Sequence, residues 1–296
     1  MRVIAWGASL LVLLLASPEA QAFCRSTTCT GSCDRDLQGC KLSGHPLAWP
    51  GLCVGFSLQK DGTANLPMEQ VRPVIEDAFV AWSDLDCKKG KASIAFSELA
   101  DVSCHASEFN KDGANANIVL FQDTKWRFHG EGDTLAKTTV TFDAGSGDIL
   151  DADLEINFAF NELTVGDDHV VYDLRSIVTH EIGHFIGIDH SDDIDATMYA
   201  GYDEGSTELR SLEVDDITAA CTVYPPDRGG ECKTTPRGGL GDACGGEPID
   251  MSAGPEGGCA LASPPASCFD PSSPTLGWLS LGIALLAQGR RRKRRP

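Results

Sequence analysis

The sequence predicts an α/β (α+β) fold, in which a twisted mixed sheet carries one histidine-bearing helix and one C-terminal helix. Short segments with the alternating or wholly apolar pattern of strands surround a long amphipathic stretch within residues 51–226. A second helical segment contains several histidines, and a third follows it. The hydrophobic content of 42% is enough for an ordinary buried core, so a chain that is disordered throughout is excluded.

The first segment, residues 1–22, is predicted to be a secretory signal peptide. A basic residue, an apolar run over residues 3–16 and an Ala-Gln-Ala cleavage site at 20–22 are typical of such peptides. A retained membrane anchor is the alternative. Export agrees with the 12 cysteines of the chain, since disulfides form and persist in oxidising compartments.

A Cys-rich segment, residues 23–50, comes next and shows little periodicity. We expect disulfides to pin this small segment, which leads into the core. Its cysteines and the first one beyond it are Cys24, Cys29, Cys33, Cys40 and Cys53.

The predicted domain spans residues 51–226. An alternating strand is expected at 53–58, and a helix at about 67–84 because its apolar residues form a single stripe. A second helix should begin after Asp173, a favourable N-cap, and extend to about residue 186. Further strands are expected at 93–96, 117–121, 135–142 and 149–156, and a third helix at 212–222.

The second predicted helix carries a His-Glu-Ile-Gly-His motif. His180 and His184 are one turn apart, so both imidazoles leave the same face of the helix. Gly187 can end the helix with a positive φ, after which the chain turns back and presents His190. Three neutral histidines leave a fourth position for water, which is the pattern of a catalytic zinc site.

Glu181 is the candidate catalytic base. It adjoins the first ligand, where it can take a proton from zinc-bound water and pass it to the leaving amine. A bare His-Glu-x-x-His motif arises by chance fairly often, whereas the extended form with Gly187 and His190 is far more specific. We therefore expect one catalytic Zn²⁺, held by His180, His184 and His190.

A methionine lies eight residues after the third histidine, in Ala-Thr-Met-Tyr at 196–199. With this match the sequence resembles the metzincin zinc endopeptidases and, within them, the matrixins, over about residues 51–226. The resemblance implies zinc-dependent cleavage of internal peptide bonds in polypeptide substrates, which lie across a zinc cleft between two unequal subdomains. It also implies that Met198 supports the metal site from below without ligating the metal.

Two further matches carry expectations of their own. Leu135, Ala136 and Lys137 are similar to the edge strand that pairs with an extended substrate in this family. Asp215 and Asp216 resemble the acidic pair that ties the last helix to the turn around the methionine. Ordinary charge at a helix end is the alternative for this pair.

Structural calcium is also implied by the resemblance, because matrixins bind it near this part of the chain. The candidate ligands are Asp148, Asp151, Asp153 and Glu155, whose oxygen atoms suit Ca²⁺. A solvated acidic turn is the alternative. A second, structural zinc is not expected, since His129 is the only histidine close to the predicted edge strand.

One departure from the family concerns latency. Matrixins are held inactive by a Pro-Arg-Cys-Gly segment whose thiolate binds the zinc, and this sequence contains no such segment. A Cys–zinc bond from Cys40 or a neighbour is an alternative to disulfide pairing of that residue.

The C-terminal part divides into a linker containing Gly, Pro and Cys, residues 227–275, and a final segment, residues 276–296. We expect this final segment to be an apolar helix followed by an Arg cluster. The apolar run is shorter than the roughly 18 residues of a spanning helix. Together with Cys268 it resembles the myxobacterial C-terminal sorting signals of the MYXO-CTERM type, which implies processing near Cys268 by sorting machinery. A plain tail anchor is the alternative.

The net charge of −19 excludes nucleic acid as the main partner. We therefore predict a secreted or surface-anchored, monomeric zinc metalloendopeptidase that meets the membrane only through its signal peptide and C-terminal tail. One alternative is a non-enzymatic adhesin or binding module on a metzincin scaffold, against which the intact Glu181 argues. The other is a zinc hydrolase of non-peptide amides.

Overall fold

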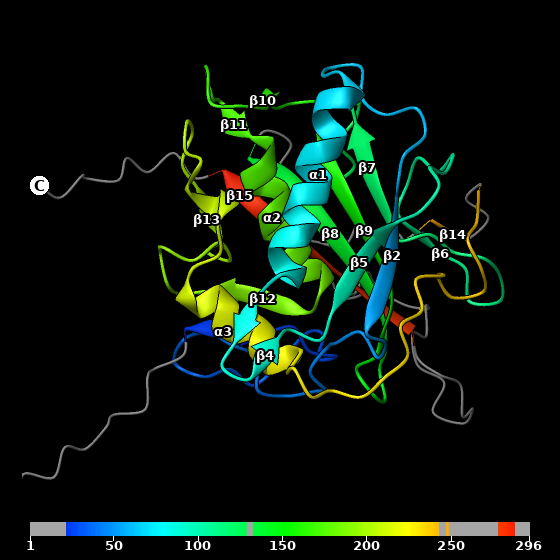
Figure 1. Cartoon of the computed structure of the whole chain (residues 1–296), viewed down its shortest axis with the longest axis vertical. Helices are drawn as coiled ribbons and strands as arrows, with labels where there is room; N and C mark the ends of the chain where they lie inside the picture. The colour runs from blue at the N-terminus through cyan, green and yellow to red at the C-terminus, as the bar shows by residue number, and fades with distance from the viewer. Residues whose placement is uncertain (1–21, 129–132, 243–246, 249–277, 288–296) are drawn as a thin grey trace, which may run out of the picture.

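A seven-stranded mixed sheet forms the centre of the computed structural model, which describes residues 22–128, 133–242, 247–248 and 278–287 (Figure 1). The order across the sheet is β13-β15-β8-β9-β7-β2-β5. Strands β2, β5, β7 and β9 are parallel, and β8 is antiparallel to β9. The strands are β2 (Cys53–Leu58), β5 (Ala95–Glu98), β7 (Ile118–Gln122), β8 (Thr134–Asp143), β9 (Ile149–Asn157), β13 (Gly201–Tyr202) and β15 (Trp278–Ala287).

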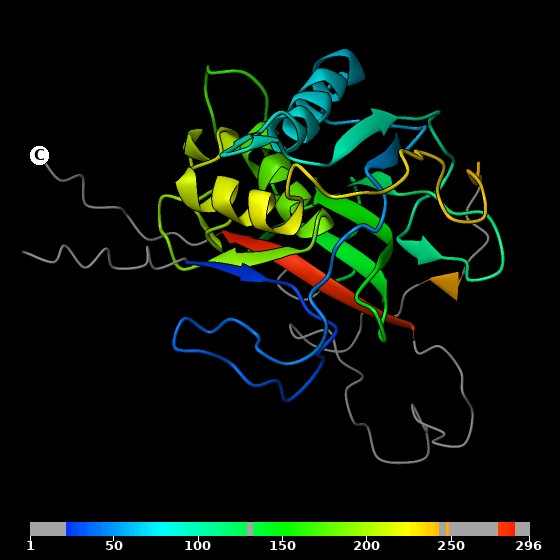
Figure 2. The same ribbon diagram turned by 60° about the horizontal axis from the view of Figure 1, so that its bottom comes forward.

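Two helices, α1 (Met68–Ser83) and α2 (Leu174–Phe185), pack together over one face of this sheet (Figures 1 and 2). The predicted apolar stripe of α1 is buried, as expected for a helix that covers a sheet. The indole nitrogen of Trp82 donates to the carbonyl of Thr179 at 2.8 Å, which ties α1 to α2. A third helix, α3 (Val214–Val223), follows the second.

Short strand pairs complete the described fold. The antiparallel pair β1 (Phe23–Arg25) and β12 (Ile188–Ser191) joins the N-terminal segment to the chain just after α2. The others are β3 (Asp86–Cys87) with β4 (Gly90–Lys91), β6 (Glu108–Phe109) with β14 (Glu247–Pro248), and β10 (Leu163–Thr164) with β11 (Tyr172–Asp173). A 3₁₀ turn spans Glu208–Arg210.

Disulfides close the N-terminal segment internally and attach the start of the predicted linker to the domain. Cys24–Cys40 and Cys29–Cys33 close loops within the N-terminal segment, and Cys87–Cys221 links β3 to α3. Cys53–Cys232 joins β2 to the first part of the predicted linker. The alternative of a Cys40–zinc bond is therefore wrong, because the sulfur of Cys40 is bonded to Cys24.

The C-terminal apolar helix is also a wrong prediction over the residues that the structure describes. Trp278–Ala287 forms strand β15, paired antiparallel with β8. A short apolar run fits a strand in a sheet as well as a helix, and the unpaired side of β8 provides backbone partners for a strand. In the described ranges, no helix is long and apolar enough to cross a membrane. Residues 1–21, 249–277 and 288–296 lie outside these ranges, so the signal peptide and the sorting signal processed near Cys268 stay predictions.

Candidate metal centre

Helix α2 is fixed at its start by the predicted N-cap. Asp173 Oδ2 accepts the backbone N–H of Ser176 at 2.9 Å and its hydroxyl at 2.7 Å. Arg210 also donates to both carboxylate oxygens of Asp173, at 2.8 and 2.7 Å, which neutralises the buried charge. The contact with Arg210 was not predicted, since it joins residues far apart in the chain.

The end of α2 confirms the role predicted for Gly187. Its φ is +86°, a conformation that residues with a Cβ rarely adopt, and its N–H donates to the carbonyl of His184 at 2.9 Å. A Cβ here would lie 2.5 Å from the carbonyl oxygen of Leu47. The chain therefore leaves the helix sharply and enters β12, which carries His190.

The three predicted ligands converge. Nε2 of His184 lies 3.1 Å from Nε2 of His180 and 3.2 Å from Nε2 of His190. Two nitrogens that bind one tetrahedral zinc at 2.0–2.1 Å lie about 3.3 Å apart, so the observed spacing suits that metal. Within the described ranges, this is the only set of three or more His, Cys, Asp or Glu side chains whose ligand atoms gather closely enough for a metal.

Hydrogen bonds at the other ring nitrogens orient two of these ligands. Nδ1 of His180 lies 2.7 Å from the carbonyl of Thr197, and Nδ1 of His184 lies 2.8 Å from that of Ile188. A carbonyl accepts only, so each Nδ1 carries the proton and each Nε2 has a free lone pair. Burial and the neighbouring histidines lower the pKa of both imidazoles, which favours the neutral form that binds a metal. The donor set therefore fits Zn²⁺.

Glu181 is buried beside the first ligand, and one contact that the sequence did not predict holds its carboxylate. The hydroxyl of Thr138 on β8 lies 2.6 Å from Oε2 of Glu181, and it also lies 3.1 Å from the backbone oxygen of that residue. The local sequence carries no signal for this pairing, because it depends on how β8 packs against α2.

Met198 lies against helix α2, which carries His180 and His184. It is fully buried, and a Cβ at Gly183 would lie 2.1 Å from its sulfur, so only glycine leaves room for it. The turn itself is held by Asp216, which accepts the N–H of Thr197 at 2.7 Å and that of Met198 at 3.0 Å. Burial raises the pKa of Asp216 to about 6.

The predicted edge-strand residues Leu135, Ala136 and Lys137 all belong to β8. Lys137 is 8% exposed, its Nζ lies 4.2 Å from the ring centre of Phe128, and burial lowers its pKa to about 8. The outer side of β8 is not free, however, because β15 pairs with it.

The four calcium candidates are not brought together as one ligand set. Glu155 forms an ion pair with Arg127, and Asp153 accepts two backbone N–H groups. Asp148 forms a β-bridge with Ala48 just before β9. Asp151 is buried, and within the described ranges neither of its carboxylate oxygens has a hydrogen-bond partner. Burial and the neighbouring Asp153 raise the pKa of Asp151. Calcium binding by these residues stays a prediction.

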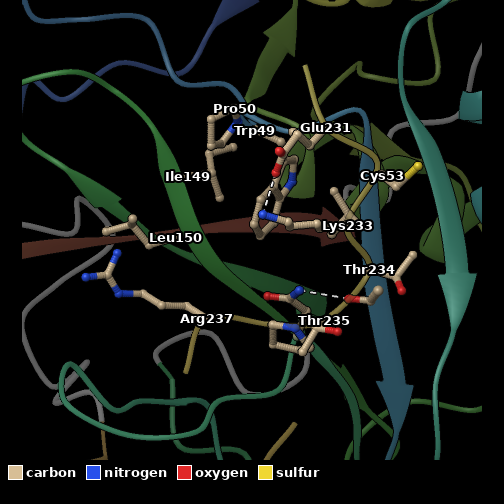
Figure 3. A pocket seen from close by; sticks show the side chains of 15 residues that line it. Trp49, Pro50, Cys53, Ile149, Leu150, Glu231, Lys233, Thr234, Thr235 and Arg237 are labelled. Carbon is tan, nitrogen blue, oxygen red and sulfur yellow. Dashed lines mark hydrogen bonds and ion pairs between the residues drawn. The ribbon is translucent and has the colours of Figure 1, made fainter. Parts of the chain in front are cut away.

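A cavity of about 410 Å³ lies elsewhere, between β2, β9 and residues 231–237 (Figure 3). Lys233 and Arg237 contribute cations to its wall, but Glu231 already pairs with Lys233. None of the three triad histidines lines this cavity. It is therefore separate from the metal centre.

Comparison of this chain with known proteins points to a family of metal-dependent proteases. Residues 49–225 match the family described as Matrixin. Matrix metalloproteinase-C of Caenorhabditis elegans is 25% identical over 202 residues, covering 64% of this chain and 32% of that protein. Metalloendoproteinase 1-MMP of Arabidopsis thaliana is 27% identical over 174 residues, covering 55% and 40%, respectively. For Metalloendoproteinase 1 of Glycine max the identity is 29% over 144 residues, covering 47% and 46%. The chain thus spans less than half the length of each of these relatives.

Proposed function

Because the chain belongs to the matrixin family, we propose that it is a zinc-dependent metalloendopeptidase that hydrolyses internal peptide bonds of proteins. The observation that carries this proposal is the convergence of three histidine Nε2 atoms. The first of these histidines is followed directly in the chain by the buried Glu181. A binding module needs neither an open metal position nor a base, whereas hydrolysis at a metal needs both.

The protein side chains divide the chemistry among them. His180, His184 and His190 hold the metal, and bound zinc supplies Lewis acidity that polarises a carbonyl and lowers the pKa of water. Glu181 takes the proton of the attacking water and delivers it to the leaving amine. Thr138, which lies 2.6 Å from Glu181 Oε2, keeps this carboxylate in place.

A polypeptide is the substrate class that suits the site. Strand β8 passes directly beside Glu181, and an extended peptide can join the edge of a sheet through backbone hydrogen bonds. Non-peptide amides lack this repeating backbone and gain less from such an edge. The names of the relatives, which include the words matrix metalloproteinase and metalloendoproteinase, support the same class.

Export belongs to the proposal as well. The four disulfides with both partners described support an oxidising compartment. A signal peptide at residues 1–22 and a sorting signal processed near Cys268 would deliver the protein to the cell surface or medium as a monomer. Pulse labelling that finds a shortened chain outside the cell would support this route, and an unprocessed chain retained in the cytoplasm would contradict it.

The test of the function uses residues 23–268, loaded with zinc, and a library of peptides blocked at both ends. An endopeptidase cleaves them between internal residues, and a chelator stops the cleavage. Matched non-peptide amides serve as the control substrates. Cleavage of these amides alone would favour the hydrolase alternative, and binding of one zinc without cleavage of any substrate would favour the adhesin.

A further inference from the structure

Strand β15 occupies the outer edge of β8 along most of its length (Figures 1 and 2). The pairing runs antiparallel from Trp278 opposite Asp143 to Leu286 opposite Thr134. On its other side, β15 pairs in parallel with the short strand β13, which follows the Met198 turn. Residues 278–287 therefore lie between β8 and β13 in the sheet.

Strand β15 runs beside the residue that contacts the proposed catalytic base. Ile283 pairs with Thr138, whose hydroxyl contacts the carboxylate of Glu181. Neighbouring strands lie about 4.8 Å apart, so the backbone of β15 passes one strand spacing from β8 at that point. Strand β15 also contacts helix α2, which carries His180 and His184.

Strand β8 has two edges, and β9 covers the inner one along nearly the whole strand. A second extended chain can therefore add to β8 beside Glu181 only on the outer edge, where β15 lies. Two strands cannot hold the same backbone N–H and C=O groups at once. A polypeptide substrate must displace β15 to reach this edge.

We propose that residues 278–287 act as an internal strand that blocks the substrate edge of β8 and keeps the full chain inactive until this segment leaves. The inference rests on the proposed function. A segment tethered in the same chain competes at an effective concentration on the order of millimolar, while KM values of enzymes lie in the range of about 1 μM to 1 mM. A substrate whose concentration is well below millimolar, and whose affinity for the edge is similar, is therefore outcompeted by the tethered strand. Cleavage near Cys268 would release it.

The test compares full chains that differ only by two prolines. Adjacent residues in an antiparallel strand alternately direct their N–H groups toward and away from the partner, so one residue of any adjacent pair donates to β8. Replacing both, as Gly282→Pro with Ile283→Pro, therefore removes one donor to β8 whichever residue supplies it. The matched control is Ser272→Pro with Ser273→Pro, upstream of β15. We expect the first variant to cleave a blocked fluorogenic peptide at least tenfold faster than wild type. The control should stay at the wild-type rate.

A second variant detects the pairing without relying on activity or on the folding of the proline variant. Thr139 and Gly282 are opposite each other in the ladder, so Thr139→Cys with Gly282→Cys places two thiols within disulfide reach. We expect oxidation to form this crosslink, as detected by mass spectrometry of peptides, and to hold activity at or below the wild-type level. Thr139→Cys with Ser272→Cys is the control pair.

Three results would overturn the inference. The first is the absence of the 139–282 crosslink, or equally efficient crosslinking in the control pair. The second is a crosslinked chain that cleaves as fast as residues 23–268. The third is a full-length wild type that already matches the rate of residues 23–268, in which case the proposed function stands without this regulation. Inactivity of residues 23–268 would instead remove the proposed function, and the blocking role with it.

Discussion

The hydroxyl oxygen of Thr138 lies 2.6 Å from Oε2 of Glu181, so one contact joins the substrate-side strand β8 to the base on helix α2. Both side chains are fully buried. A hydroxyl at this distance donates a strong hydrogen bond to the carboxylate and restricts its rotation. We therefore regard Thr138 as the residue that positions Glu181 for proton transfer.

Thr138→Val should lower kcat of residues 23–268 by about tenfold to a hundredfold, since a hydrogen bond to a charged group contributes about 1.5–3 kcal/mol. KM and zinc content should change little, because no zinc ligand is altered. Thr138→Ser keeps the hydroxyl and should restore most of the activity. A valine variant with the wild-type kcat would show that Thr138 does not position the base.

Asp216→Ala should destabilise the turn around Met198. It leaves the N–H groups of Thr197 and Met198 buried without their acceptor, which costs about 1–3 kcal/mol for each group. Zinc affinity should also fall by about tenfold to a hundredfold, because the Thr197 carbonyl orients His180. Urea unfolding and zinc titration measure the two effects. The exposed Asp192→Ala is the control, and equal losses in both variants would contradict this role.

The buried Asp151 predicts an unusual pH dependence. Its pKa is raised in the folded state, by burial first and by Asp153 second, while the unfolded value is about 3.9. The folded protein therefore holds this proton more tightly, so its contribution to the free energy of unfolding falls as the pH rises above about 4. Asp151→Asn removes this loss and should stabilise the protein at pH 7 more than at pH 4.

Urea unfolding of wild type and Asp151→Asn across this pH range tests the sign, with the partly exposed Asp148→Asn as the control. A variant that is less stable than wild type at pH 7 would contradict the prediction. If millimolar calcium stabilises wild type but not the variant, the oxygen atoms of Asp151 bind calcium, and the calcium prediction gains support.

The disulfides should contribute according to the loops they close. Cys53–Cys232 spans 179 residues and Cys29–Cys33 spans 4. Because Cys87–Cys221 lies inside the first loop and shortens it to about 45 residues, loop entropy predicts contributions of about 4 and 2 kcal/mol, respectively. Replacing both cysteines of the first pair by serine should lower the free energy of unfolding more than replacing both of the second. The reverse order would show that native contacts, rather than loop entropy, decide the stability.

The metal centre was predictable because its determinants are local. The spacing of His180 and His184, the positive φ at Gly187 and the N-cap Asp173 all follow from a few neighbouring residues. The main strands and helices also followed from periodicity, with ends that differ by a few residues. Positions within one helix turn are set by backbone geometry alone, so no tertiary information was required.

Features that depend on distant partners were missed. The two-residue strands β6 and β13 exist because remote segments pair with them. The apolar segment 278–287 forms a strand because β8 offers an edge. Packing brings the Thr138 hydroxyl to Glu181, and it also buries the Asp151 carboxylate, which has no hydrogen-bond partner among the described residues. Composition cannot distinguish such residues from ordinary strand positions, since each depends on what the opposing element supplies.

The most direct test of the central claim measures kcat/KM of zinc-loaded residues 23–268 for the wild type and for Glu181→Gln, with the zinc content determined in both. The glutamine keeps the size of the side chain but cannot accept the proton. We predict one bound zinc per chain in each protein, and a loss of about 10²–10⁴-fold in kcat/KM for the variant. Equal cleavage by the two zinc-loaded proteins would contradict the assignment of Glu181 as the base of a zinc endopeptidase.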